Sequence, residues 1–487
     1  MSSGSHRQIF RSSAITGGAS AAAIAIGIVK VKLLAVLLGS SGIGIMGVYQ
    51  NVMALSSTLA GCGIATSAVR QLAASAGDRE TLAVVRRTLW LSHLALGAVG
   101  MVVLWLVRKH AAISLFGSDE RAADVGWLGV GVLLTLVAGS QTALMQGLRR
   151  IEDLARTNVV SALFGAAAGT LAIYVGGSPA IIWFVLLGPA LGVLVARRFT
   201  ARLPPAPTLP GRAALAKQLR RMLILGIPFV AGGVLTTATQ LVARSFILRE
   251  LGPDASGHFH AAWAISMTYI GFVLGAMATD YYPRLAGSFA DLPRTRQLVA
   301  EQTEMGLLLA GPVLLAMVTF APLVIHLLYT STFSPSSEIL RWQMLGDVLK
   351  VAAWPMGFVL LAAGRGGLFL AAECVWSVAY LGAVFLGVQQ WGLVASGTGF
   401  WFAYCVSFGL LGFAVRRLIG FKGGCRIWLL ICGLELGGGG ALLLAGQSAT
   451  AGYAGGAIAT LAAGAYSIHR LDRLLGARAA LARFFGR

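Results

Sequence analysis

The chain has 487 residues, of which 57% are hydrophobic and only 11% are charged, and its formal net charge is +20. Soluble domains carry about 25% charged residues, so the composition excludes a large soluble protein and indicates a polytopic membrane protein. A basic excess is also typical of nucleic-acid binding, but here the lysines and arginines lie in short loops between apolar segments, where they set membrane topology. We therefore expect no nucleic acid among the partners.

Fourteen apolar segments are long enough to cross a bilayer as helices. The first reaches Leu38, which makes it too long for the core of a signal peptide, so we expect it to remain as a helix. The pattern predicts an all-α polytopic membrane protein of about 14 transmembrane helices, at approximately 12–38, 43–75, 86–107, 123–147, 157–176, 179–197, 221–248, 256–283, 303–328, 338–363, 366–388, 391–415, 426–446 and 451–469.

The distribution of basic residues predicts the orientation of the chain. If the N-terminus is cytoplasmic, 28 of the 38 lysines and arginines fall on the cytoplasmic side and 5 fall outside. Cytoplasmic loops carry an excess of lysine and arginine, so both termini are predicted to lie in the cytoplasm, an N-in/C-in topology.

The chain contains an internal repeat with a shift of 213 residues. The segment 63–78 falls on 276–291 with six of sixteen positions identical, and LLG (37–39) falls on ELG (250–252). Each unit contains six predicted spans, an even number, so the two units have the same orientation and are parallel repeats. Transporters built from parallel repeats bind substrate where two lobes meet and rock against each other.

The repeat and the basic, proline-rich stretch in the middle of the chain predict four parts. These are an N-terminal six-helix lobe (1–198), a cytoplasmic linker (199–220), a C-terminal six-helix lobe (221–418), and two extra helices with a basic cytoplasmic tail (419–487). The linker is expected to stay in water because its prolines stop helices and its charges resist burial.

Two charged residues lie inside the apolar segment 338–363. Asp347 and Lys350 are three residues apart, so they share one face of a helix. Asp347 lies roughly 13 Å from Glu338 along the helix, near the middle of the membrane, where a charge costs about 2.5–3.5 kcal/mol. We expect Lys350 to bind substrate and Asp347 to couple an ion inside a wet cavity. A purely structural buried pair is the alternative.

Two further cations lie within predicted spans. Lys32 lies about 10 Å from the outer end of the first span, and Arg244 lies nearly opposite it in the repeat. Together with Lys350 they outnumber the central carboxylate, and a basic cavity with low-dielectric walls attracts an anion. We expect Lys32 and Arg244 to bind substrate, with snorkelling to the headgroups as the alternative.

Four charged residues complete the candidate site. Arg70 and Arg284 mark the cytoplasmic ends of two spans and are expected to bind substrate. Asp280, one helical turn before Arg284, and Glu373, about 7 residues into its span, are expected to couple an ion, because an intramembrane carboxyl group can carry a proton. The alternatives are a structural Asp280–Arg284 pair that anchors topology and a neutral, hydrogen-bonded Glu373.

No recognisable catalytic motif is present. The sequence lacks a GxxxxGK[ST] phosphate loop and an HExxH or GxSxG motif, and no cysteine pair has the spacing of a metal site. We therefore expect a transporter rather than an enzyme, with no cofactor and no metal, driven uphill by an ion gradient or by the membrane potential.

Several stretches resemble one family. Its pattern is carried by Lys32-Leu33-Leu34-Ala35 with the glycines that follow, LMQGLRR (144–150), YYPRL (281–285) and WQMLGDVLK (342–350). Over most of residues 10–420 the chain resembles the Wzx-type polysaccharide flippases, of the O-antigen and lipid III kind. These belong to the multidrug/oligosaccharidyl-lipid/polysaccharide exporter superfamily.

The resemblance implies a function. The protein would move an undecaprenyl-diphosphate-linked oligosaccharide from the cytoplasmic to the periplasmic leaflet of a bacterial inner membrane, for surface polysaccharide biosynthesis. Its partners would be that lipid-linked glycan, membrane lipids and polysaccharide-assembly proteins. Lys32, Asp347 and Lys350 match the family's motif positions, and Arg70 stands where the pattern also has a basic residue. Many Wzx proteins have twelve spans, whereas the fourteen predicted here match the lipid II flippases of the same superfamily.

Two other functions remain open from the residues alone. An ion-coupled drug or organic-cation antiporter of the same superfamily would place carboxylates, rather than lysines and arginine, in its cavity. A membrane glycosyltransferase, polymerase or ligase would need a large outer loop or catalytic acids. The longest predicted outer loop, 108–126, is short but contains three acidic residues.

Overall fold

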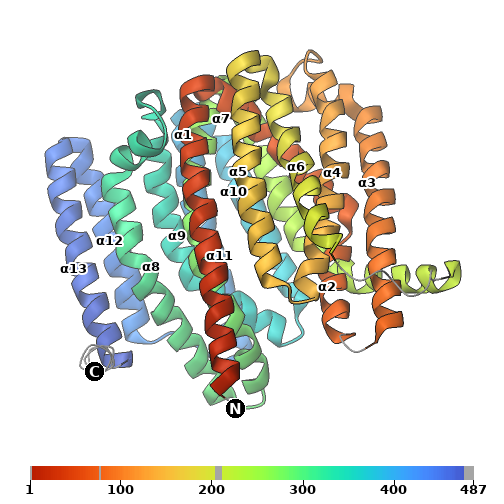
Figure 1. Ribbon diagram of the computed structural model, residues 1–487. Coiled ribbons are helices and arrows are strands. Elements are labelled where there is room, and N and C mark those ends of the chain that lie inside the picture. Colours follow the sequence, from red (N-terminus) through yellow and green to blue (C-terminus); the bar gives the residue numbers. More distant parts are fainter. Residues whose placement is uncertain (1–2, 76–77, 203–210, 476–487) are drawn as a thin grey trace. The chain divides into compact units, whose positions relative to one another are not determined.

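The structure is a computed structural model and describes residues 3–75, 78–202 and 211–475. Within these ranges the chain forms thirteen α-helices and three short 3-10 helices and no strand, which confirms the all-α prediction (Figure 1). The α-helices are α1 (Ser3–Gly61), α2 (Ile64–Ala74), α3 (Arg79–Phe116), α4 (Ala122–Gly147), α5 (Ile151–Gly176), α6 (Ile181–Thr200), α7 (Arg212–Ser288), α8 (Leu292–Leu328), α9 (Ser336–Ala362), α10 (Gly366–Trp391), α11 (Ala395–Ile419), α12 (Cys425–Gln447) and α13 (Ala449–Leu475).

The helices have the length and hydropathy of membrane spans. In the described part of the chain nine helices are long and apolar enough to cross a bilayer, or ten if a bent pair within α7 counts as one span. One crossing needs about 20 residues, whereas the continuous stretches Ala22–Gly61 and Gly366–Ile419 contain 40 and 54 residues. The protein is a polytopic membrane protein, and the number of fourteen spans stays a prediction.

The predicted segment 43–75 is two helices rather than one. Helix α1 ends at Gly61, and α2 begins at Ile64 after two residues with positive φ, Cys62 at 46° and Gly63 at 67°. A Cβ at Gly63 would lie 2.6 Å from the carbonyl carbon of Gly226 in α7. The two backbones approach so closely at this break that no side chain fits at Gly63, and the positive φ also favours glycine there.

Two predicted breaks between spans coincide with kinks inside α1 and α7, at which the backbone leaves helical geometry and two helices meet. Helix α1 bends at Gly39, with φ 64°, and α7 bends at Gly252, with φ 87°. These glycines are the pair that the 213-residue shift superimposes. Glycine adopts positive φ without steric cost, so the same residue produces the same local bend in both repeats.

The linker and the tail are described only in part. Helix α7 begins at Arg212, nine residues before the predicted span at 221, so part of the predicted linker 199–220 is helical. Residues 203–210 of that linker and residues 476–487 of the basic tail lie outside the described residues. The division into two six-helix lobes, a linker and a C-terminal helix pair stays a prediction.

The repeat is also visible in two helix caps. Asp78 accepts hydrogen bonds from the backbone N–H groups of Glu80 and Thr81 at the start of α3. Asp291, which is 213 residues later, accepts one from the N–H of Arg294 at the start of α8. Aspartate is a preferred N-cap because it satisfies donors that a helix start leaves unpaired.

Replacing the first of these caps should make the protein less stable. Hydrogen bonds from the Thr81 hydroxyl and backbone lower the pKa of Asp78. A lowered folded pKa means that the cap stabilises above the unfolded pKa and is lost as pH falls through the folded value. We expect Asp78→Ala to lower the melting temperature in detergent at pH 7 and to lower it by a smaller amount at pH 3, and Asp78→Ser to have a smaller effect than Asp78→Ala at pH 7. An equal loss at both pH values would contradict this role.

The structure consists of two compact units, residues 1–257 with 328–330 and residues 258–327 with 331–487. In the first unit a buried apolar cluster joins α2, α3, α4 and α7 through Leu72, Leu89, Leu144 and Met222. In the second unit α9 is the most buried candidate span, since 78% of its apolar 18-residue stretch is buried. Charged residues on α9 are therefore enclosed by the helices packed around it.

The last two helices belong to the second unit. A Cβ at Gly311 of α8 would lie 2.7 Å from Leu434 of α12, and Gly438 of α12 packs equally closely against Leu345 of α9. Small residues let membrane helices approach closely, which explains Gly311 of α8 and Gly438 of α12. Arg470 of α13 donates to Glu304 of α8 at 2.8 Å, an ion pair that fastens α13 to this unit.

Candidate functional site

Helix α9 places an ion pair in the interior of the second unit. Asp347 is 0% exposed, and its Oδ1 lies 3.8 Å from Nζ of Lys350, one turn later. The hydroxyl of Ser266, on α7, donates to Oδ2 of Asp347 at 2.6 Å. The predicted shared helical face is therefore present, and Ser266 supplies a second stabilising partner that the spacing did not indicate.

Lys350 is surrounded by soft and aromatic groups as well as by its carboxylate. Its Nζ lies 3.4 Å from the sulfur of Met267 and 5.9 and 5.7 Å from the ring centroids of Phe400 and Tyr404 on α11. Aromatic faces attract cations and are more stabilising when water is excluded. The lysine side chain is 17% exposed, so it keeps some access to solvent while its partner has none.

Glu373 joins this group from α10. It is half-buried and lies within electrostatic range of Lys350, and Tyr404 lies within range of both carboxylates. The structure thus brings together three of the predicted site residues, Asp347, Lys350 and Glu373. Two carboxyl groups beside one ammonium group form a cluster whose net charge changes when a carboxyl group takes up a proton or when a cation binds.

Arg244 occupies the interior of the first unit and is 2% exposed. Its Nη1 donates to the backbone carbonyl of Gly47 at 2.6 Å and to the side-chain carbonyl of Asn51 at 3.1 Å, both on α1. Asn51 in turn donates to Gln240, one turn before Arg244. A snorkelling arginine would reach headgroups, whereas this guanidinium group is enclosed by protein oxygens.

Lys32 and Arg244 meet at one residue. The ammonium group of Lys32 donates to the backbone carbonyl of Tyr329, a residue that also interacts electrostatically with Arg244. Tyr329 is only 2% exposed. The two cations that the repeat placed opposite each other therefore share a neighbour within the first unit.

The remaining predicted site residues are placed differently. Arg70 is exposed on α2, and Arg284 is exposed near the C-terminal end of α7. The side chain of Asp280 lies outside the described residues, so the predicted pair with Arg284 stays a prediction. The roles of all eight residues in substrate binding or ion coupling also stay predictions.

Sequence reasoning missed the partners that complete both clusters. Ser266 and Tyr329 are 81 and 297 residues away from the charges that they contact. Serine and tyrosine are ordinary residues of membrane helices, and nothing in their local sequence marks them. Glu435 on α12 likewise has a partner that its local sequence does not indicate: it accepts a hydrogen bond from the indole N–H of Trp401 at 3.1 Å.

Proteins similar to this chain share its fold and its type of sequence. The lipid III flippase of Escherichia coli (strain K12) is 24% identical over 364 residues, which cover 74% of this chain and 86% of that protein. The lipid II flippase MurJ in an inward closed conformation superposes with a TM-score of 0.70 at 12% identity, over 96% of this chain and 100% of the other. An inward-facing multidrug resistance MATE family transporter of the MOP superfamily superposes with a TM-score of 0.64 at 18% identity, over 81% and 94%.

The two structural likenesses describe the fold alone, because a common helical architecture persists where sequence and function have diverged. The family profile described as polysaccharide biosynthesis protein, in contrast, matches residues 33–338, which is well over half of the chain. That match includes Lys32's neighbours in α1, Arg244 in α7 and all of α8. The chain therefore belongs to the polysaccharide biosynthesis protein family.

Proposed function

We propose that this protein is a flippase that moves an undecaprenyl-diphosphate-linked oligosaccharide from the cytoplasmic to the periplasmic leaflet by alternating access. The observation that carries the proposal is the family match over residues 33–338 in a chain of membrane-spanning helices. The 24% identity to a lipid III flippase over most of that protein supports the same type of cargo. The glycan would be a building unit of an O-antigen or common-antigen type of surface polysaccharide.

The proposed location is the bacterial inner membrane. Bacterial outer-membrane proteins are β-barrels, whereas the described residues of this chain are helical. The protein would act as a transporter and not as an enzyme, since its fold matches those of transporters. Polysaccharide-assembly proteins would deliver and receive the cargo.

The buried charges suggest how such a cargo would be held. Lys32, Arg244 and Lys350 are proposed to attract the diphosphate, since cations in a low-dielectric interior bind anions strongly. Arg70 and Arg284, which are exposed, would meet the headgroup earlier on its path. Asp347, Asp280 and Glu373 would couple an ion, because protonation of a carboxylate beside Lys350 changes the charge that the cargo meets.

Leaflet exchange in proteoliposomes tests the proposal. Undecaprenyl-diphosphate-linked oligosaccharide would be placed in one leaflet and its exposure followed with and without a pH or Na⁺ gradient. We expect exchange that requires the protein and exceeds the rate in empty liposomes by at least about tenfold, a barrier reduction of about 1.4 kcal/mol. Arg365→Lys, in the exposed turn between α9 and α10, should behave as the unchanged protein.

One specific outcome would favour the antiporter instead. The MATE-like fold is compatible with export of an organic cation. Gradient-driven uptake of a soluble organic cation, combined with no exchange of the lipid-linked glycan, would replace the flippase proposal.

A further inference from the structure

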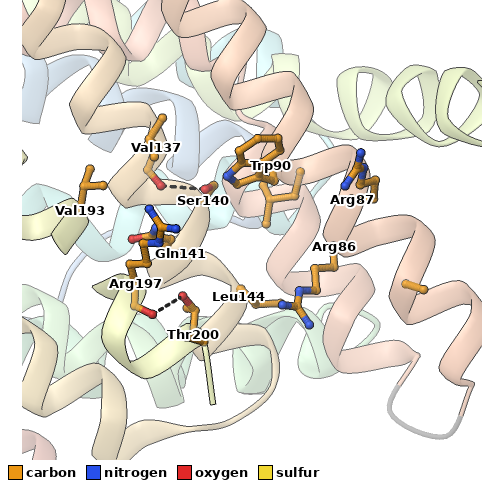
Figure 2. Close-up of a pocket in the computed structure, with 13 residues that line it drawn as sticks. Arg86, Arg87, Trp90, Val137, Ser140, Gln141, Leu144, Val193, Arg197 and Thr200 are labelled. Atoms are coloured by element: carbon orange, nitrogen blue, oxygen red, sulfur yellow. Dashed lines mark hydrogen bonds between the residues drawn. The ribbon is translucent and has the colours of Figure 1, made fainter. Parts of the chain in front are cut away.

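A pocket of about 650 Å³ opens among α3, α4 and α6 of the first unit (Figure 2). None of the eight residues proposed for transport belongs to it. Its polar lining consists of Arg86, Arg87, Ser140, Gln141, Arg197 and Thr200. None of its thirteen lining residues, all of them within the described part of the chain, is acidic.

The three arginines that line the pocket come from two helices, α3 and α6. Arg86 extends into the pocket from α3, while Arg197 enters from α6 and lies beside Gln141 (Figure 2). Guanidinium groups confined together repel each other, so an anion in the pocket would be stabilised by several of them at once. Their planar donor geometry matches phosphate oxygens particularly well.

Gln141 indicates that the ligand also carries hydroxyl groups. This residue is only 9% exposed, and its Oε1 is buried without a hydrogen-bond partner among the described residues. Neighbouring Ser140 and Thr200 do not fill that role, because their hydroxyls donate to the carbonyls of Val137 and Arg197 (Figure 2). A buried amide oxygen without a donor is costly, so a ligand hydroxyl at this position would stabilise the site.

The position of the pocket along its helices places it at the depth of lipid headgroups. Arg197 and Thr200 lie in the last turn of α6, and Gln141 lies two turns before the end of α4 at Gly147. The 38 residues of α3 extend for about 57 Å, far beyond the roughly 30 Å hydrocarbon core, so the ends of α3 extend beyond the core. The indole ring of Trp90 is 43% exposed, and tryptophan is enriched at the interface between membrane and water.

We infer that this pocket binds the headgroup of an anionic phospholipid from the cytoplasmic leaflet, with phosphatidylglycerol as the best match. Its phosphate would contact Arg86 and Arg197, a glycerol hydroxyl would donate to Gln141, and the start of its acyl chains would lie against Trp90. Basic pockets between helices on the cytoplasmic side recognise phosphate headgroups in this way. The pocket is then a lipid site separate from the transported cargo.

Native mass spectrometry of the purified full-length protein tests this inference. After delipidation, the protein would be titrated with phosphatidylglycerol and with phosphatidylcholine, which has no net charge. We expect phosphatidylglycerol to bind at least about tenfold more tightly, a difference of about 1.4 kcal/mol. The double variant Arg86→Gln/Arg197→Gln should lose this preference, whereas Arg198→Gln, an exposed arginine beside the pocket but not in its lining, should keep it.

A second variant tests the role of the hydroxyl. Gln141→Leu should reduce the preference for phosphatidylglycerol over phosphatidic acid, which carries phosphate but no glycerol headgroup, and should leave binding of phosphatidic acid unchanged. The single variant Arg197→Gln, at an exposed helix end, provides the charge test if the double variant does not give a monodisperse protein. Loss of the preference in either charge variant supports the inference.

Three results would overturn it. Equal binding of the two phospholipids would mean that the arginines only set topology. Displacement of phosphatidylglycerol by millimolar inorganic phosphate would mean a general anion site. Displacement by an equimolar amount of undecaprenyl-diphosphate-linked oligosaccharide would assign the pocket to the transported lipid, a result that leaves the proposed flippase function intact.

Discussion

Asp347→Asn is expected to reduce leaflet exchange by at least about tenfold, an increase of about 1.4 kcal/mol in the transport barrier. The carboxylate is fully buried, accepts from Ser266 at 2.6 Å and lies 3.8 Å from the ammonium group of Lys350. Asparagine has nearly the same shape and keeps an acceptor for Ser266, but it removes the charge and the proton-binding site. The rate of exchange in proteoliposomes, normalised to inserted protein, measures the effect.

A second variant separates transport from stability. Removing one partner of a buried ion pair leaves the other charge uncompensated and costs about 3–5 kcal/mol, whereas replacing both by apolar residues is often neutral. Asp347→Leu/Lys350→Met should therefore insert and melt like the unchanged protein but remain inactive. Full exchange by this double variant would mean that the pair only stabilises the helix bundle.

The matched control for both variants is Arg365→Lys. Arg365 is exposed in the turn after α9, and a lysine there keeps the positive charge. A large loss of exchange in this control would show that the assay responds to any change near α9, and the Asp347 result would then carry no weight.

Gly257→Ala is expected to destabilise the protein strongly, in contrast to Gly139→Ala. A Cβ at Gly257 would collide with the backbone carbonyl of Ser40, and one at Gly44 would collide with that of Pro253. Backbone atoms cannot turn aside as a flexible side chain can, so overpacking here costs about 1–3 kcal/mol or more. Thermal stability in detergent, followed by size-exclusion chromatography, measures the loss.

The close contact between Ser40–Gly44 and Pro253–Gly257, which we call the crossing, is a feature of the repeat. Gly44 and Gly257 are 213 residues apart and follow the two kink glycines, Gly39 and Gly252, by five residues each. The chain therefore turns and then packs one repeat's helix start against the other's, with glycine at the closest point on both sides. The Ser40 hydroxyl also donates to Asp254 at this crossing.

Gly139→Ala is the control for the crossing. Gly139 lies in α4, its φ is not positive, and an added methyl group would have no neighbouring atom within 4 Å. Alanine favours helix over glycine by about 0.8–1.0 kcal/mol, so this variant should be as stable as the unchanged protein or slightly more stable. Equal destabilisation by Gly139→Ala and Gly257→Ala would remove the close approach as the cause.

Several features follow from local sequence. Hydropathy predicted a helical membrane protein, because burial of apolar residues in lipid requires no long-range information. The three-residue spacing of Asp347 and Lys350 predicted their shared face, since helical geometry alone decides it. The 213-residue shift predicted that the two repeats have the same local structure, and they do share a glycine kink and an aspartate helix cap at matching positions.

Local sequence misled where packing overrides propensity. The apolar stretch 43–75 reads as one helix, yet it breaks at Cys62 and Gly63, where α7 packs closely through Gly226. The breaks predicted after Leu38 and between 248 and 256 do coincide with non-helical backbone, at the kinks of Gly39 and Gly252. Local sequence does not show a contact such as that between Gly63 and Gly226, because the two residues are far apart in the chain.

By itself the sequence determined the membrane class, the helical architecture, the repeat and the charged face of α9, because each depends on composition or on short spacings. Only the tertiary structure decided which neighbours those charges have. Ser266 reaches Asp347 from 81 residues away, Tyr329 reaches Lys32 from 297, and Arg86 and Arg197 share one pocket. Such pairings depend on how whole helices pack, and helix packing is a property of complete surfaces and not of any single segment.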